Sequence, residues 1–443
     1  MSEPTTNTPP STDASATTVP DPTVLPAATP RGPFAVLRRG PFARYAGGDA
    51  VSMIGYWMQA TVQSIVMTNL TDKAVWLGMV NFAGSMPMIA LTLYGGATAD
   101  RLDKRKIIIA CQAVQIVLAL AVGWLVAAGH VQIWHILTAA TLLGISASFE
   151  MPATAALVPE MVDREEIAAA MAIDRSIFHG TRLIGPAIAG FVIGKLGNAS
   201  AFYINAATFL ASIAAIASVL PRKQGSEEEE KERSSGMRAG IDFVRNDRPT
   251  LAMLGLMAAG SLCVFPFMAV TLPLYAKQQL GMDETHMGYI MAFSGVGSLV
   301  ASFGVVAVPR PSRTAWLVAG ALDVALSLAG LALARTFWQA AIALTTLGLG
   351  TSFNYGIANT AVQERAPGPL RGRVSALAMM SFIGVMPVAS VGVGKLADVI
   401  GLRTAMAGGA LIYGVAALWV VTGAGRRCSE LPAAETGAVP AKA

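Results

Sequence analysis

Charged residues are scarce in this chain of 443 residues: 13% are Asp, Glu, Lys or Arg, whereas 54% are hydrophobic. Soluble domains carry about 25% charged residues, and the few charges of this chain form short clusters between long apolar stretches. The composition therefore excludes an ordinary soluble protein. It is typical of a helical protein that crosses a membrane several times.

The chain is also poor in residues that bind metals or carry out catalysis. Its three cysteines, Cys111, Cys263 and Cys428, are far apart, and its four histidines are not closely paired. We therefore expect no disulfide framework, metal site or cofactor. The absence of P-loop, HExxH and GxGD patterns argues against ATP-driven transport and against an intramembrane enzyme. The basic residues adjoin apolar stretches, so they indicate membrane topology and not a nucleic-acid partner.

Twelve apolar windows predict an all-α membrane protein with twelve transmembrane helices in two pseudo-symmetric six-helix bundles. The windows are 45–70, 75–99, 106–128, 131–157, 167–194, 199–220, 250–276, 286–308, 314–334, 337–362, 373–395 and 402–423. The expected domains are bundles at 41–220 and 250–425, a cytoplasmic linker at 221–249, and cytoplasmic tails at 1–40 and 426–443. The N-terminal tail lacks the basic and apolar regions of a signal peptide, so we expect it to be disordered.

The distribution of Lys and Arg predicts that both termini are cytoplasmic. With that orientation the inner segments carry 24 of these residues, the outer loops 6 and the spans 2. Positively charged loops stay in the cytoplasm, so we expect a multi-pass protein of the cytoplasmic (inner) membrane. The halves also repeat: GISASF at 144–149 recurs as GLGTSF at 348–353, and GKL at 194–196 recurs at 394–396. Two equivalent halves with a site between them are typical of a transporter.

Polar stripes on two windows indicate residues that line a central cavity. At 100° per residue one face of the first window carries Asp49, Ser52, Tyr56, Gln59 and Gln63, and the tenth window carries Ser352, Tyr355, Asn359 and Gln363. Polar groups that face lipid cost several kcal/mol, so each stripe faces either a water-filled cavity or another helix. We expect a cavity; hydrogen bonding between helices is the alternative.

Ionisable residues within the windows are functional candidates. They are Glu150, Asp174, Arg175, His179, Arg182 and Asp323. Glu150 and Arg175 lie at similar depths on antiparallel windows, so an ion pair between them is expected, with a purely structural role as the alternative. Arg182 either shares Glu150 or meets an anionic substrate. Gly185, Pro186 and Gly190 in the same window predict a close helix-packing contact between the halves.

The charged segment from Tyr94 to Lys106 resembles the loop between the second and third helices of the major facilitator superfamily. Gly96, Asp100, Arg101, Lys104 and Arg105 occupy the positions of that signature, with Asp103 in place of its second glycine. The resemblance implies that Gly96 permits close packing. It also implies that Asp100, reinforced by Arg101, joins the start of the eleventh helix near Arg371 and Arg373 in the outward-open state. The second-half copy, Gly304–Arg313, keeps Arg310 and Arg313 but has no Asp.

Four other stretches resemble the branch of that superfamily that contains enterobactin exporters and macrolide efflux proteins. They are IGYWMQ at 54–59, FEMPATAALVPEMV at 149–162, RLIGPAIAG at 182–190 and RGRVSAL at 371–377. The resemblance implies a proton-coupled antiporter that exports a siderophore or drug, and that is neither an enzyme nor dependent on a cofactor. A proton-coupled importer on the same fold, or a non-transporting receptor or scaffold, is the alternative.

The expected partners are a small molecule, protons and the lipid bilayer, with the protein acting as a monomer. The expected site residues combine the polar stripes with the embedded ionisable groups. For the substrate they are Tyr56, Gln59, Gln63, Glu150, Arg182, Tyr355 and Asn359; for the proton they are Asp49 and Glu150.

Overall fold

The computed structural model describes residues 35–38, 40–219 and 238–422, and every regular element in these ranges is helical. The predicted C-terminal tail, nearly all of the predicted N-terminal tail and residues 221–237 of the predicted linker lie outside the described residues. The rest of the linker segment contains helix α8 (Arg238–Asn246).

Twelve long helical segments make up the membrane-spanning part. The first six are α1 (Gly40–Leu70), α2 (Ala74–Arg101), α3 (Lys104–Ala127), α4 (Ile133–Glu160), α5 (Ile167–Leu196) and α6 (Asn198–Ala217). The second six are α9 (Arg248–Cys263) continued through η3 (Phe267–Thr271) into α10 (Leu272–Gln278), α11 (Glu284–Val306), α12 (Arg313–Leu333), α13 (Phe337–Arg365), α14 (Arg371–Ile383) continued as α15 (Met386–Ile400), and α16 (Leu402–Thr422). Single 3₁₀ turns are η1 (Ala35–Arg38), η2 (Arg164–Glu166), η4 (Arg310–Ser312) and η5 (Gly368–Leu370).

Ten of these segments are long and apolar enough to cross a membrane by composition alone. The two that fall short, α1 and α13, are 31 and 29 residues long and pack within the bundles. They are the two helices whose sequences carry the polar stripes. Polarity along one face lowers their average hydropathy although their length still spans the bilayer.

Two predicted spans are interrupted where the sequence places proline or glycine. The span 250–276 changes from α-helix to a π-helical turn after Pro266, and Pro273 opens α10. The span 373–395 breaks at Gly384, and Pro387 lies in the first turn of α15. Proline lacks a backbone N–H and clashes with the preceding turn, so both helices bend near mid-length.

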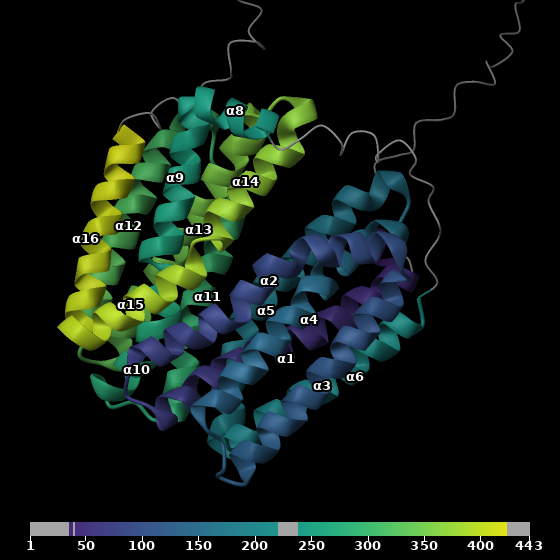
Figure 1. Ribbon diagram of the computed structural model, residues 1–443. Helices are drawn as coiled ribbons and strands as arrows, with labels where there is room; N and C mark the ends of the chain where they lie inside the picture. Colours follow the sequence, from purple (N-terminus) through teal and green to yellow (C-terminus); the bar gives the residue numbers. More distant parts are fainter. Residues whose placement is uncertain (1–34, 39, 220–237, 423–443) are drawn as a thin grey trace, which may run out of the picture.

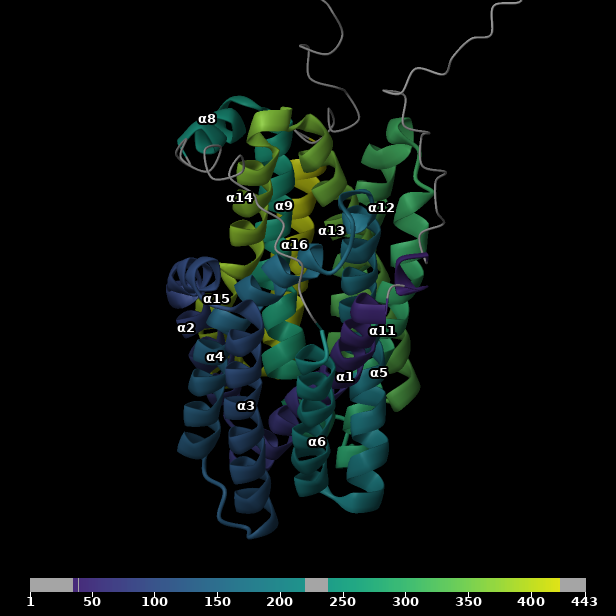
Figure 2. The ribbon, with the colours of Figure 1, turned by 90° about the vertical axis from the view of Figure 1, so that its right-hand side faces the viewer.

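The helices form two bundles that meet along two pairs of helices. α5 packs against α11, and α2 packs against α15. Figure 1 shows the two bundles close together around α10 and α15 and separated at the end where α8 lies. Figure 2 shows α3 and α6 side by side at the periphery of the first bundle, away from the second. We call the end that carries α8 the α8 side; the C-terminal ends of α2 and α4 lie toward it.

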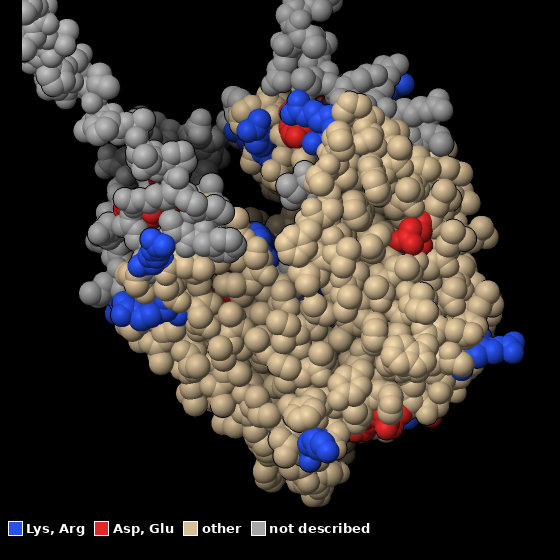
Figure 3. Space-filling model, turned by 180° about the vertical axis from the view of Figure 1, so that it is seen from behind, with Lys and Arg blue, Asp and Glu red and all other residues tan. Residues whose placement is uncertain are grey.

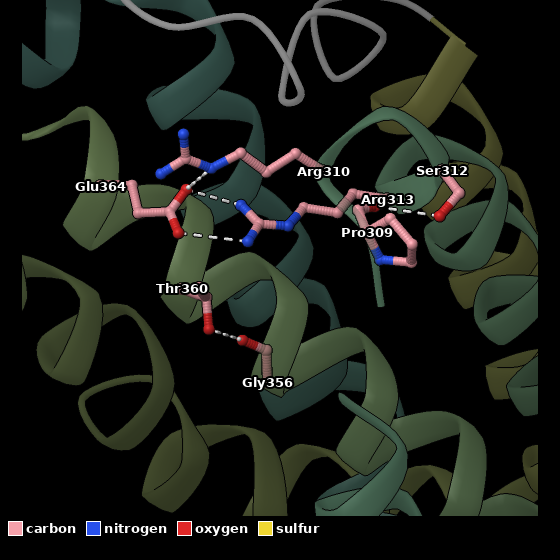
Figure 4. A network of polar contacts seen from close by, with 7 residues as sticks. All are labelled: Pro309, Arg310, Ser312, Arg313, Gly356, Thr360 and Glu364. Atoms are coloured by element: carbon pink, nitrogen blue, oxygen red, sulfur yellow. Dashed lines mark hydrogen bonds and ion pairs between the residues drawn. The ribbon is translucent and has the colours of Figure 1, made fainter. Parts of the chain in front are cut away.

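The internal repeat is visible as the same ion pair in both bundles. Lys104 at the start of α3 contacts Glu160 at the end of α4, with Nζ and Oε1 2.8 Å apart. Arg313 at the start of α12 contacts Glu364 at the end of α13, with Nη1 and Oε2 2.7 Å apart (Figure 4). Glu364 follows Glu160 by 204 residues, the offset of GISASF and GLGTSF. Arg310 adds a second guanidinium to Glu364 at 3.2 Å.

Candidate functional site

A hollow between the bundles opens on the α8 side. Figure 3 shows this hollow, with basic side chains at its rim and a belt of uncharged side chains below it. On the opposite side, hydrogen bonds join the bundles. Lys277 Nζ donates to Thr68 O at 2.5 Å, Asn198 Nδ2 donates to Glu284 Oε2 at 2.9 Å, and Asn69 also donates to Glu284. The structure is therefore open on the α8 side and closed on the other.

Two groups of aromatic rings face each other across the bundle interface. In the first bundle Trp57 makes edge contacts with Tyr56 and Phe178, at centroid distances of 5.4 and 5.6 Å. In the second bundle Phe382 makes edge contacts with Phe265 and Tyr355, at 4.8 and 5.0 Å. Phe265 and Phe382 lie near the two helix breaks, and Tyr355 lies on α13. The three rings of the second group therefore come from three different membrane-spanning segments.

Arg182 of α5 lies between the two aromatic groups. Its guanidinium carbon is 5.5 Å from the centre of the Trp57 ring and 5.7 Å from the centre of the Phe265 ring. A guanidinium within about 6 Å of a ring centre gains from cation–π attraction. The pocket beside Phe265 is mainly apolar; it is lined by Leu256, Met257, Gly260, Phe265, Thr351, Asn354, Tyr355, Phe382 and Tyr413.

Glu150 of α4 is bound by two amides of α3 and not by Arg175. Gln112 Nε2 donates to Oε1 at 3.0 Å, and Gln115 Nε2 donates to Oε2 at 2.5 Å. The expected Glu150–Arg175 ion pair is wrong for this conformation, in which the Arg175 side chain is exposed. The two glutamines supply hydrogen-bond donors to the carboxylate from the neighbouring helix, and among the described residues the carboxylate makes no ion pair.

Two further carboxylates lie near Glu150. Asp174 of α5 accepts a hydrogen bond from the buried Tyr45 hydroxyl at 3.0 Å. Asp49 of α1 is half-buried and lies within electrostatic range of both Asp174 and Glu150. Like charges within electrostatic range repel each other more in a medium of low dielectric constant than in water. Binding of a proton by one member relieves that repulsion.

The polar stripes do not all line the hollow. Tyr56 and Tyr355 are 45% and 36% exposed, and Gln63 and Asn359 are half-buried. Gln59, which we expected in the cavity, is 7% exposed and accepts a hydrogen bond from Asn205 of α6 at 2.7 Å. For Gln59 the alternative of hydrogen bonding between helices is the correct one, because α6 supplies a buried amide opposite it.

The glycines of α5 lie at two different contacts. A Cβ on Gly190 would be 2.8 Å from Thr285 O of α11, and a Cβ on Gly288 of α11 would be 2.5 Å from the Gly190 Cα. Gly190 thus lies at the interface between the bundles. A Cβ on Gly185, next to the buried Pro186, would be 2.4 Å from Trp57 Cβ within the first bundle. The absence of side chains at these positions permits the close approach of the helices.

The predicted contact of Asp100 with the eleventh helix is not formed in this conformation. Asp100, Arg101 and Arg371 are exposed, and Asp100 makes no hydrogen bond or ion pair with any residue that the structure describes. Lys104 pairs with Glu160, and Arg105 donates to Ala217 O at the end of α6 at 2.6 Å.

Two details of that segment differ from the expectation or extend it. A Cβ on Gly96 would have no neighbour within 4 Å, whereas one on Gly95 would lie 1.9 Å from Ser148 O. Gly95, not Gly96, provides the close packing here. A Cβ on Gly240 of α8 would lie 2.9 Å from Arg373 Cβ, so α8 packs against the start of α14.

Several residues of the site were missed in the sequence. Gln112 and Gln115 are polar residues in an otherwise apolar window, three positions apart, and this spacing could have indicated a shared partner. Trp57, Phe265 and Phe382 carried no such signal because aromatic residues are common in apolar helices. Among the described residues, no group of three or more His, Cys, Asp or Glu side chains is arranged to hold a metal ion.

The family model described as "Transmembrane secretion effector" matches residues 31–440. The chain is 25% identical to the multidrug efflux pump Tap of Mycolicibacterium fortuitum over 88% of its own length and 96% of Tap. It is 25% identical to the staphyloferrin A transporter of Staphylococcus aureus over 79% of its length and 87% of that protein. A solved structure of a bacterial homolog of the human lysosomal transporter Spinster, inward-facing and unoccupied, aligns with a TM-score of 0.65 at 14% identity, covering 90% of this chain and 98% of that one.

Proposed function

Because this chain belongs to the transmembrane secretion effector family of major facilitator transporters, we propose that it exports a small amphipathic organic compound, such as a siderophore or a drug, in exchange for protons. The relatives named as a multidrug efflux pump and a staphyloferrin A transporter support this substrate range. The observation that carries the proposal is the hollow between the bundles, which opens on one side only. The aromatic groups and the Arg182 guanidinium at the bundle interface, and the three carboxylates of the first bundle, support it.

The α8 side is the cytoplasmic side in this proposal. The short segments at that end carry Arg101, Lys104, Arg310, Arg371 and Arg373, and positively charged loops stay in the cytoplasm. The protein is then a monomer of the cytoplasmic membrane with both termini inside, and the structure corresponds to the inward-open state. The bundles at 41–220 and 250–425 are the two bodies that move relative to each other.

Asp49 and Glu150 are the proposed proton sites. Both are carboxylates within the membrane on the first bundle, and embedded carboxylates are costly unless they are paired or protonated. Glu150 has two amide donors but no cation among the described residues that contact it. A proton that arrives from the outer side would lower the negative charge of the cluster by one and favour the return to the inward-open state. The outward-open state would then be held on the cytoplasmic side by Asp100 at the start of α14.

The test is proton-driven flux in proteoliposomes. The protein is reconstituted, a pH gradient is imposed in either direction, and transport of two fluorescent amphipathic compounds, one anionic and one cationic, is measured. We expect substrate to move against the proton flow. Glu150→Gln and Asp49→Asn should abolish gradient-driven flux while substrate exchange without a gradient persists.

A matched control is Asp323→Asn, which removes an embedded carboxylate of α12 that hydrogen-bonds Ser327 away from the cluster. It should retain gradient-driven flux. If Glu150→Gln left the gradient dependence intact, Glu150 would not carry the proton. Movement of substrate together with protons would favour the importer, and a complete lack of flux and of ligand-dependent thermal shift would favour a receptor or scaffold.

A further inference from the structure

We propose that the substrate is an organic anion with an aromatic or conjugated ring, whose charge is bound by Arg182 and whose ring lies between the two aromatic groups. This inference rests on the transport function proposed above and names the chemical class of its substrate.

The first observation is that Arg182 has unused hydrogen-bonding capacity. A guanidinium has five N–H donors, yet that of Arg182 makes no hydrogen bond or ion pair with any residue that the structure describes. The guanidinium lies instead over the rings of Trp57 and Phe265. These attractions compensate only partly for holding a charge inside the membrane. The arginine is therefore suited to an acceptor that arrives with the substrate.

The second observation is an indole N–H without an acceptor beside the guanidinium. Trp57 Nε1 is buried and has no hydrogen-bond partner among the described residues. A buried donor without an acceptor costs about 1–3 kcal/mol, so such groups are rare unless a ligand or water satisfies them. Trp57 and Arg182 are thus two neighbouring hydrogen-bond donors, and neither has an acceptor among the described residues.

The carboxylates of the site do not serve as acceptors for Trp57 or Arg182. Glu150 is bound by Gln112 and Gln115, and Asp174 is bound by Tyr45. No ion pair joins any of these acids to Arg182 among the described residues. Since the positive charge stays apart from the negative cluster, an anionic substrate can reach the first without displacing the second.

The third observation concerns the uncharged, aromatic part of the ligand. Tyr56, Trp57 and Phe178 belong to the first bundle, and Phe265 and Phe382 belong to the second. A flat ring between these groups can stack on one and contact the edge of the other, which is worth about 0.5–1.5 kcal/mol per aromatic pair beyond the area it buries. A carboxylate, sulfonate or phenolate on that ring would lie at Arg182, where a guanidinium binds planar anions in a bidentate manner.

The test compares two ligands that differ only in charge. Binding of 2-naphthoate and 2-naphthamide to the full-length protein in lipid nanodiscs is measured by titration calorimetry at pH 7.5. Wild type should bind the naphthoate at least about tenfold more tightly, the effect of one charge-assisted hydrogen bond. Arg182→Gln should lose this preference while its affinity for the amide stays within about threefold, and Arg182→Lys should keep part of the preference.

Arg403→Gln is the matched control. Arg403 also lies over an aromatic ring, that of Tyr275 at 6.0 Å, but it is exposed at the start of α16 on the closed side. It should leave both affinities unchanged. Equal wild-type affinities for the two ligands, equal loss of both in Arg182→Gln, or loss of the preference in Arg403→Gln would each overturn the proposal.

Failure of this inference is distinguishable from failure of the export mechanism. If either fluorescent compound is exported in exchange for protons while the naphthoate preference is absent, the transporter assignment stands and the anion site falls. If the preference depends on Arg182 but a pH gradient moves no substrate, the anion site stands and proton-coupled export falls.

Discussion

The Asp398 carboxylate near the end of α15 caps the first turn of α2 in the other bundle. Oδ1 accepts a hydrogen bond from the Ala74 backbone N–H at 2.6 Å, and Oδ2 accepts one from Val75 at 3.0 Å. The N-cap residue of α2, Lys73, provides no side-chain cap. The free backbone N–H groups at the start of α2, which also carry a partial positive charge, are therefore hydrogen-bonded by a residue of the other bundle. This contact lies on the closed side.

Removal of this carboxylate should favour opening on that side. Asp398→Ala leaves two N–H groups of α2 without their acceptor, and a charged cap contributes about 1–2 kcal/mol. We expect the population of molecules closed on that side, relative to those open on it, to fall about five- to thirtyfold. Labelling of single cysteines introduced near Thr71 and Gln279 by a membrane-impermeant reagent measures the change.

Asp283→Ala is the control for the Asp398 variant. Asp283 caps α11 by accepting from the His286 N–H at 2.8 Å, but both residues belong to the second bundle. Its removal should lower the melting temperature without altering cysteine labelling. If the two variants change labelling equally, the Asp398 contact contributes only to stability.

The repeated ion pairs predict unequal effects on stability. Glu364 contacts two guanidiniums, those of Arg310 and Arg313, whereas Glu160 contacts one ammonium group. Glu364→Gln should lower the free energy of unfolding by about 2 kcal/mol, and Glu160→Gln by less than about 1 kcal/mol. Thermal melting of the detergent-solubilised variants measures both. A larger loss in Glu160→Gln would contradict the comparison.

The helices of this fold could be predicted from the sequence because lipid requires each long apolar window to form a helix. The interruptions near Pro266 and Gly384 were missed, since an apolar window with proline is compatible with either a bend or a break. α1 and α13 were also predicted as apolar windows, although their polar faces leave them outside the ten segments that are apolar enough to span a membrane by composition alone.

The site was predicted less completely, for a physical reason. The sequence shows which side chains share a helix face but not which side chains lie opposite them. Gln59 therefore looked like a cavity residue until Asn205 was found against it, and Glu150 looked like a partner of Arg175 until Gln112 and Gln115 were found closer.

Two adjacent glycines of α2 should respond differently to the same substitution. A Cβ at position 95 would lie 1.9 Å from Ser148 O, and one at position 96 would meet nothing within 4 Å. Gly95→Ala should separate α2 from α4 and cost about 1–3 kcal/mol of stability, whereas Gly96→Ala should leave the melting temperature unchanged. If Gly96→Ala nevertheless slows transport, Gly96 is needed for close packing in the other conformational state.

The Asp247–Arg365 pair should contribute stability that depends on pH. Arg365 Nη2 lies 2.6 Å from Asp247 Oδ1, with the two side chains 8% and 17% exposed. Burial alone would raise the pKa of Asp247, but hydrogen bonds from Arg365 and Thr250 outweigh it and the pKa lies below its ordinary value. A lowered carboxyl pKa means that folding favours the ionised form. The contribution is then complete above the unfolded-state pKa of about 3.9 and disappears as the pH falls through the lower folded-state value.

Asp247→Asn should therefore lower the free energy of unfolding by about 3 kcal/mol at neutral pH, because it removes the carboxylate charge that the buried Arg365 guanidinium contacts. Thermal melting from pH 7 to pH 3 should show a constant difference between wild type and variant down to about pH 4, and a shrinking one below it. Asp283→Asn, at an exposed cap, is the control and should give a much smaller difference at neutral pH. A difference for Asp247→Asn that is the same at pH 3 and pH 7 would show that packing, and not the charge of Asp247, stabilises the junction of α9 and α13.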